Sequence, residues 1–222
     1  MASRLAAFYR SSVGKKIIMG VTGLILVGFV VSHVLGNLLI FQGPGKLDEY
    51  SAFLRSTGKL LWIARGGLLV AVILHIDAAF KLTVRSRSGR PLAYVRRQPQ
   101  ASTMAARSMR AGGVLLLVFI VFHLLHFTFG TVHPDRGHFN HEMVTHNLLT
   151  GFPSIWFLLL YEVSMIALGM HLYHGTVAMM MSLGVSHPRY TPLWRKIAAA
   201  LAVLVAAGFM TIPLAIFFHV IG

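Results

Sequence analysis

Apolar residues run along the chain in five long stretches, separated by shorter segments that are polar and mostly basic. A helix rises about 1.5 Å per residue and the hydrocarbon core is about 30 Å thick, so about 20 apolar residues cross it. Lipid offers no partner to an unpaired backbone amide, so each stretch is predicted to be helical. The predicted spans are residues 17–41, 60–84, 111–131, 153–183 and 197–221.

The composition agrees with a membrane protein. Of the 222 residues, 56% are hydrophobic and only 12% are charged, whereas a soluble domain has about 25% charged residues. Five spans leave no room for a large second domain, so residues 1–222 are expected to form a single transmembrane domain. The predicted fold class is an all-α integral membrane protein, a bundle of five transmembrane helices.

The formal net charge is +14. The charges lie between the apolar runs, which membrane topology and anionic lipid headgroups explain better than nucleic acid, so no nucleic-acid partner is expected. Basic residues concentrate in the N-terminal tail and in the second and fourth connections, which predicts a cytoplasmic N-terminus and an outside C-terminus. The second connection, residues 85–110, either docks a soluble partner or is simply a retained basic loop.

Cysteine is absent, which removes iron–sulfur ligation, disulfides and covalently attached haem from this chain. Histidine is the remaining abundant ligand, with 12 residues. Ionisable residues inside spans are costly and by default mark function, although a lone histidine can also be a packing residue. Four spans carry interior histidines: His33, His75, His123 with His126, and His171 with His174.

These histidines fall at two depths. Measured from the inner end of its span, His33 lies at about 25 Å and His123 at about 20 Å. Measured from the outer end, His75 lies at about 15 Å and His171 at about 27 Å. His33 and His123 therefore share the outer half of the membrane, and His75 and His171 share the inner half.

Two imidazole pairs at two depths are what two stacked b-type haems require, because haem iron takes one axial ligand on each face of the porphyrin. Filling both axial positions suits electron transfer. Small residues one turn away, such as Gly36 and Gly175, would let a flat ring approach and would also suit helix packing. Spacing leaves open whether His126 replaces His123 and whether His174 replaces His171.

Other polar residues carry weaker expectations. Glu162 in the fourth span is either a proton carrier or bonded to a neighbouring helix. Asp77 either orients a histidine or pairs with Lys81 at i+4, and the pairing is the preferred reading. Basic residues at helix ends, including Arg65 and Arg110, pair with haem propionates or snorkel to headgroups.

The third connection and the fourth span carry two further clusters. Clustered histidines can bind zinc, but a wet loop is the preferred interpretation for the third connection. The methionines at residues 179–181 are expected to pack or face lipid. The histidines of the third connection are His133, His138, His141 and His146.

Three segments carry a family resemblance. The first span reads KKIIMGVTGLILVGFVVSHVLGN, the third RAGGVLLLVFIVFHLLHFTF, and the fourth contains HLYHGTVAMMMSLG. In order and spacing they resemble the two-haem (type B) cytochrome b membrane-anchor subunit of succinate dehydrogenase and fumarate reductase, respiratory complex II. The family's four ligands match His33, His75, His123 and His171.

The resemblance implies a distal haem b on His33 and His123 and a proximal haem b on His75 and His171. It also implies a flavoprotein subunit with FAD, an iron–sulfur subunit with its clusters on the cytoplasmic face, and a membrane quinone, often menaquinone, as electron partner. The chain itself would carry no dehydrogenase active site, and it would lie in a bacterial inner membrane, with a higher oligomer of the complex left open. No quinone-pocket residue is assigned.

Two alternatives remain at this point. The chain is a dihaem anchor of another respiratory complex, of the hydrogenase, formate dehydrogenase or nitrate reductase type, or it is a transporter with proton-relay histidines. The transporter reading predicts no haem absorbance, whereas both anchor readings predict a strong Soret band.

Overall fold

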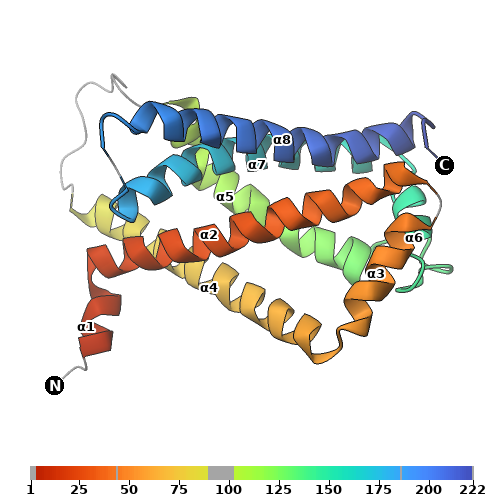
Figure 1. Ribbon diagram of the computed structural model, residues 1–222, viewed down its shortest axis with the longest axis horizontal. Helices are drawn as coiled ribbons and strands as arrows, with labels where there is room; N and C mark the ends of the chain where they lie inside the picture. Colours follow the sequence, from red (N-terminus) through yellow and green to blue (C-terminus); the bar gives the residue numbers. More distant parts are fainter. Residues whose placement is uncertain (1–3, 44, 90–102, 186, 222) are drawn as a thin grey trace.

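The computed structural model describes residues 4–43, 45–89, 103–185 and 187–221. Within these ranges the chain is all-helical without strands, and five helices are long and apolar enough to cross a membrane (Figure 1). These are α2 (Ser12–Asn37) with a 3-10 extension (Leu38–Gln42), α4 (Lys59–Ser88), α5 (Met104–His123) with a π-helical extension (Leu124–Thr128), α7 (Ile155–Ser182) and α8 (Thr191–Phe217). The five predicted spans are thus confirmed as helices.

α2, α5 and α8 begin several residues before the apolar runs that predicted them. α2 begins at Ser12 rather than at residue 17, because the Ser11 hydroxyl caps it by accepting a hydrogen bond from the Gly14 amide at 2.9 Å. Thr103 caps α5 in the same way. α8 begins at Thr191 rather than at residue 197, with a proline in its first turn. Hydropathy predicts the part of a helix that crosses the lipid, whereas capping residues determine where the helix begins.

Only some of the long helices pack closely against one another in the described chain. α7 and α8 lie side by side, α2 packs against α4, α7 and α8, and α5 packs against α7 (Figure 1). In the described chain, α2 and α5 are not a closely packed pair, and neither are α4 and α7. Side chains that connect these helices must therefore reach across the space between them.

Within the described chain, α4 packs closely against one helix only, α2. Its small residues Ala71 and Ala78, 3% and 1% exposed, form its close contact surface with the bundle. By contrast, the consecutive residues 62–67 are all exposed. They span more than one helical turn, so no face of this segment packs against another helix.

Three short helices were not predicted: α1 (Arg4–Arg10), α3 (Lys46–Ser56) and α6 (Val144–Leu149). α3 and α6 cover the end of the bundle where the C-terminus lies, and the N-terminus lies at the opposite end (Figure 1). Asp48 Oδ1 accepts a hydrogen bond from the Thr145 amide at 2.9 Å, which ties the first connection to the third. Residues 90–102, half of the segment expected to dock a partner or to be a plain basic loop, lie outside the described residues.

Candidate functional site

The first pair consists of His33 on α2 and His123 on α5. Their ring centres are 6.0 Å apart and the ring planes are nearly perpendicular, at 83°. Phe29 stacks on the His33 ring at 5.2 Å, and Phe209 of α8 approaches it at 5.7 Å. Apolar rings therefore hold His33 in place across the gap between α2 and α5.

The second pair consists of His75 on α4 and His171 on α7, with ring centres 6.3 Å apart. Thr22 of α2 places its Oγ1 at 3.2 Å from Nδ1 of His75 and donates its own hydrogen to the Ile18 carbonyl at 2.7 Å. Because that hydroxyl has a single hydrogen, Nδ1 of His75 is the donor in their contact. The lone pair of His75 is therefore on Nε2, as in a metal-ligating histidine whose other ring nitrogen is hydrogen-bonded.

Both pairs fit a metal between their rings. An imidazole nitrogen binds a first-row metal at about 2.0 Å and lies about 1.1 Å from its ring centre, so two rings on opposite sides of one iron have centres about 6.2 Å apart. The observed separations of 6.0 and 6.3 Å match this value. The donor set, neutral imidazole from facing helices, is also the one that b-type haem takes.

The structure distinguishes each paired histidine from its neighbour one turn away. His126 is 0% exposed and is enclosed by the rings of Phe127, Phe157 and His133 at 4.0–5.2 Å, whereas His123 is half-buried and faces His33. In the described chain His174 makes no ring contact, while His171 meets His75. The structure thus brings the four histidines predicted as ligands together in two separate pairs. Their role as ligands stays a prediction.

The small residues near the histidines serve different purposes. At Gly175, one turn from His171, an added Cβ would meet nothing within 4 Å. At Gly36, one turn from His33, it would lie 2.5 Å from Cε1 of Tyr50. Of the two readings of Gly36, the structure therefore supports helix packing, because this glycine lies against Tyr50 of α3.

Tyr161 on α7 was missed by the sequence analysis. Its hydroxyl lies 3.3 Å from Nδ1 of His123 and 2.9 Å from Nδ1 of His126. The π-helical extension begins directly after His123 and contains His126, and such local widening is frequent at functional sites. One tyrosine in an apolar helix gives no pattern, so only the packing of α5 on α7 reveals this contact.

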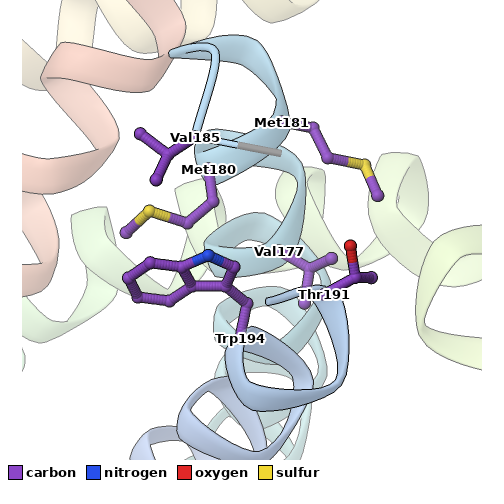
Figure 2. A pocket seen from close by; sticks show the side chains of 6 residues that line it. All are labelled: Val177, Met180, Met181, Val185, Thr191 and Trp194. Carbon is purple, nitrogen blue, oxygen red and sulfur yellow. The ribbon is translucent and has the colours of Figure 1, made fainter. Parts of the chain in front are cut away.

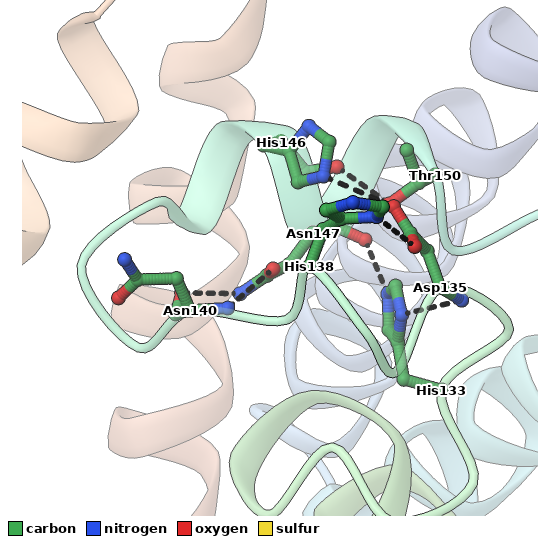
Figure 3. A network of polar contacts seen from close by, with 7 residues as sticks. All are labelled: His133, Asp135, His138, Asn140, His146, Asn147 and Thr150. Carbon is green, nitrogen blue, oxygen red and sulfur yellow. Dashed lines mark hydrogen bonds and ion pairs between the residues drawn. The ribbon is translucent and has the colours of Figure 1, made fainter.

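The histidines of the third connection make structural hydrogen bonds (Figure 3). His133, 1% exposed, donates from Nε2 to the Asn147 carbonyl at 2.8 Å and accepts at Nδ1 from the Asp135 amide at 3.1 Å. The Asp135 carboxylate contacts His138 at 2.8 Å and His146 at 3.2 Å. The hydrogen bond from His138 lowers the pKa of Asp135 below its usual value. Among the described residues, no group of three or more metal-binding side chains occurs.

Asp77 and Glu162 have contrasting surroundings. Asp77 forms the predicted ion pair with Lys81 at 2.6 Å, and it also contacts the buried Lys15 at 3.6 Å and the hydroxyl of Tyr9. It therefore connects α4 to α2 and to α1. Oε1 of Glu162 is buried without a hydrogen-bond partner among the described residues, so of the two alternatives for Glu162 the bond to a neighbouring helix is not made at this atom.

The methionines at residues 179–181 lie away from both pairs. Met179 is buried, whereas Met181 is 50% exposed. Met180 and Met181 line a small apolar pocket with Trp194 at the start of α8 (Figure 2).

The basic residue Arg65 of α4 lies over the ring of Trp62 at 5.1 Å, which is a cation–π contact.

Comparison of the chain with family models, with curated proteins and with solved structures gives no match.

Proposed function

We propose that this chain is the dihaem cytochrome b anchor subunit of a succinate:quinone oxidoreductase in a bacterial inner membrane. The observation that carries the proposal is the presence of two imidazole pairs, His33 with His123 and His75 with His171, at the separation a single iron requires. When bound, haem iron supplies one-electron redox chemistry. The resemblance of the histidine-bearing spans favours complex II over the other respiratory anchors.

The residues of the chain would bind the two haems, orient the ligating histidines and shield the haems from water. His33 and His123 would bind the distal haem b, and His75 and His171 the proximal haem b. Thr22 would orient His75 by accepting from its Nδ1 at 3.2 Å. Phe29 beside His33 supports the same reading, since an apolar shell excludes water and helps to set the potential of a metal site.

The partners follow from what this chain lacks. Without cysteine it holds no iron–sulfur cluster, so electrons would enter from an iron–sulfur subunit that is coupled to an FAD-bearing flavoprotein. The basic end of the bundle would face the cytoplasm, where that subunit docks. The electron acceptor or donor within the membrane would be a quinone, menaquinone in the reading preferred here.

The direct test is spectroscopic. The chain purified in detergent is expected to show a Soret band and, after dithionite reduction, the difference spectrum of two b haems per polypeptide by pyridine haemochrome quantification. In native membranes, succinate should reduce these haems. A colourless chain, or a single haem per chain, contradicts the proposal. Two haems that respond to hydrogen or formate but not to succinate would assign the chain to another respiratory complex.

A further inference from the structure

The hydroxyl of Tyr161 lies between two imidazoles. Its oxygen is 3.3 Å from Nδ1 of His123 and 2.9 Å from Nδ1 of His126. Tyr161 itself is 7% exposed and packs in a buried cluster with Phe152, Ile212 and their neighbours. Its ring is fixed by this packing, so the hydroxyl is a rigid reference point for both histidines.

The number of hydrogens on Tyr161, His123 and His126 restricts which of these groups can donate in each contact. A neutral imidazole carries one N–H, and a phenol has one hydrogen to donate. If His123 binds iron through Nε2, its hydrogen is on Nδ1 and is donated to the Tyr161 oxygen. The Tyr161 hydroxyl is then free to donate to Nδ1 of His126, at the shorter distance of 2.9 Å. The hydrogen of His126 is in that case on Nε2.

The surroundings of His126 differ from those of His123. Its Nε2 atom is buried without a hydrogen-bond partner among the described residues. The side chain is 0% exposed and lies against Phe127, whose ring centre is 4.0 Å away. No flat cofactor has room on this face, whereas the half-buried ring of His123 remains open toward His33.

We propose that Tyr161 is the positioning residue of the first pair. It holds His123 in the Nδ1–H tautomer, with Nε2 directed to the iron, and it selects His123 rather than His126 as the ligand. The inference rests on the proposed function. A hydrogen-bond acceptor on the far nitrogen makes a ligating imidazole more basic, which favours oxidised iron and lowers the reduction potential.

The test is a redox titration of the purified two-haem chain carrying Tyr161→Phe. The distal potential is expected to rise by about 60 mV, which corresponds to a tenfold loss of preference for the oxidised form in a one-electron couple. The proximal potential should stay unchanged. Thr22→Val, which removes the corresponding acceptor from His75, should shift the proximal potential and leave the distal one unchanged.

Tyr173→Phe is the matched control, since Tyr173 is another partly buried tyrosine of α7 that packs in a different cluster. It should change neither potential. If Tyr161→Phe keeps both haems at wild-type potentials, the positioning role is wrong and the dihaem function stands. If wild-type chain binds no haem, the proposed function itself fails.

A second pair of variants tests ligand selection without relying on Tyr161. His123→Gln should lose one of the two haems, and His126→Gln, which retains an acceptor for the Tyr161 hydroxyl, should keep both. The reverse outcome would overturn the selection of His123.

Discussion

His75 and His171 meet at 6.3 Å between ring centres, although α4 and α7 are not a closely packed pair in the described chain. Packing of α4 on α7 does not explain why the two rings meet, because these two helices make few contacts with each other. A shared ligand between them gives the arrangement a physical reason. His33 and His123 repeat it between α2 and α5.

This geometry predicts an asymmetry between His171 and His174. His171→Ala should reduce the haem content from two per chain to one, because the second pair loses a ligand. His174→Ala should keep two haems, since its ring faces no partner histidine. Haem quantification on both purified variants is the measurement. Two haems in the His171 variant with one in the His174 variant would reverse the assignment in α7.

Gly36 and Gly28 should respond differently to alanine. At Gly36 the added methyl group would lie 2.5 Å from Tyr50, so Gly36→Ala should destabilise the protein by about 1–3 kcal/mol through overpacking. At Gly28 no atom lies within 4 Å, and Gly28→Ala should be neutral or stabilising by up to about 1 kcal/mol. Unfolding in mixed micelles measures both, and equal stabilities would show that Tyr50 moves aside freely.

Removing Asp77 should destabilise the protein more than removing Lys81. Asp77→Ala leaves Lys15, whose side chain is 4% exposed, without its carboxylate, and an uncompensated buried charge is costly. Lys81→Ala removes a charge that is nearly half exposed and leaves Asp77 paired with Lys15. The unfolding midpoint should therefore fall further for Asp77→Ala. A larger fall for Lys81→Ala would mean that Lys15 does not depend on Asp77.

The Asp135 cluster predicts a pH dependence. His138 lowers the pKa of Asp135 in the folded chain, so the carboxylate contributes stability above its unfolded pKa, near 3.8, and loses this contribution as the pH falls through the lowered value. Wild type should therefore exceed Asp135→Asn in thermal stability between about pH 4 and pH 5. The margin should shrink at lower pH. A margin that does not change with pH would exclude a role for this charge.

The sequence was sufficient for the spans and for which histidines lie opposite each other, because both follow from apolar length and the rise of a helix. It was insufficient for Thr22 and Tyr161. A single hydroxyl in an apolar run has no periodicity, and whether it reaches a histidine depends on how neighbouring helices are rotated and packed. The short α3 and α6 were missed for a related reason, since their stability comes from contacts between distant connections such as Asp48 with Thr145.

The π-helical extension after His123 also lay beyond sequence reasoning. Regular helical geometry placed His123 and His126 on nearly the same face, which left them interchangeable. The structure separates them by burial, with His126 fully enclosed and His123 open toward His33. Packing of Phe127 and Phe157 around His126 decides this difference, and no local pattern encodes it.

The exposed stretch of α4 has a consequence for biogenesis. In the described chain α4 packs closely against α2 and no other helix, and residues 62–67 are all exposed. On the proposed function, bound porphyrin would add the contact between α4 and α7 that helix packing does not supply. A newly translated chain without haem would hold α4 through α2 alone, and membrane quality-control proteases would degrade it faster than the haem-loaded form.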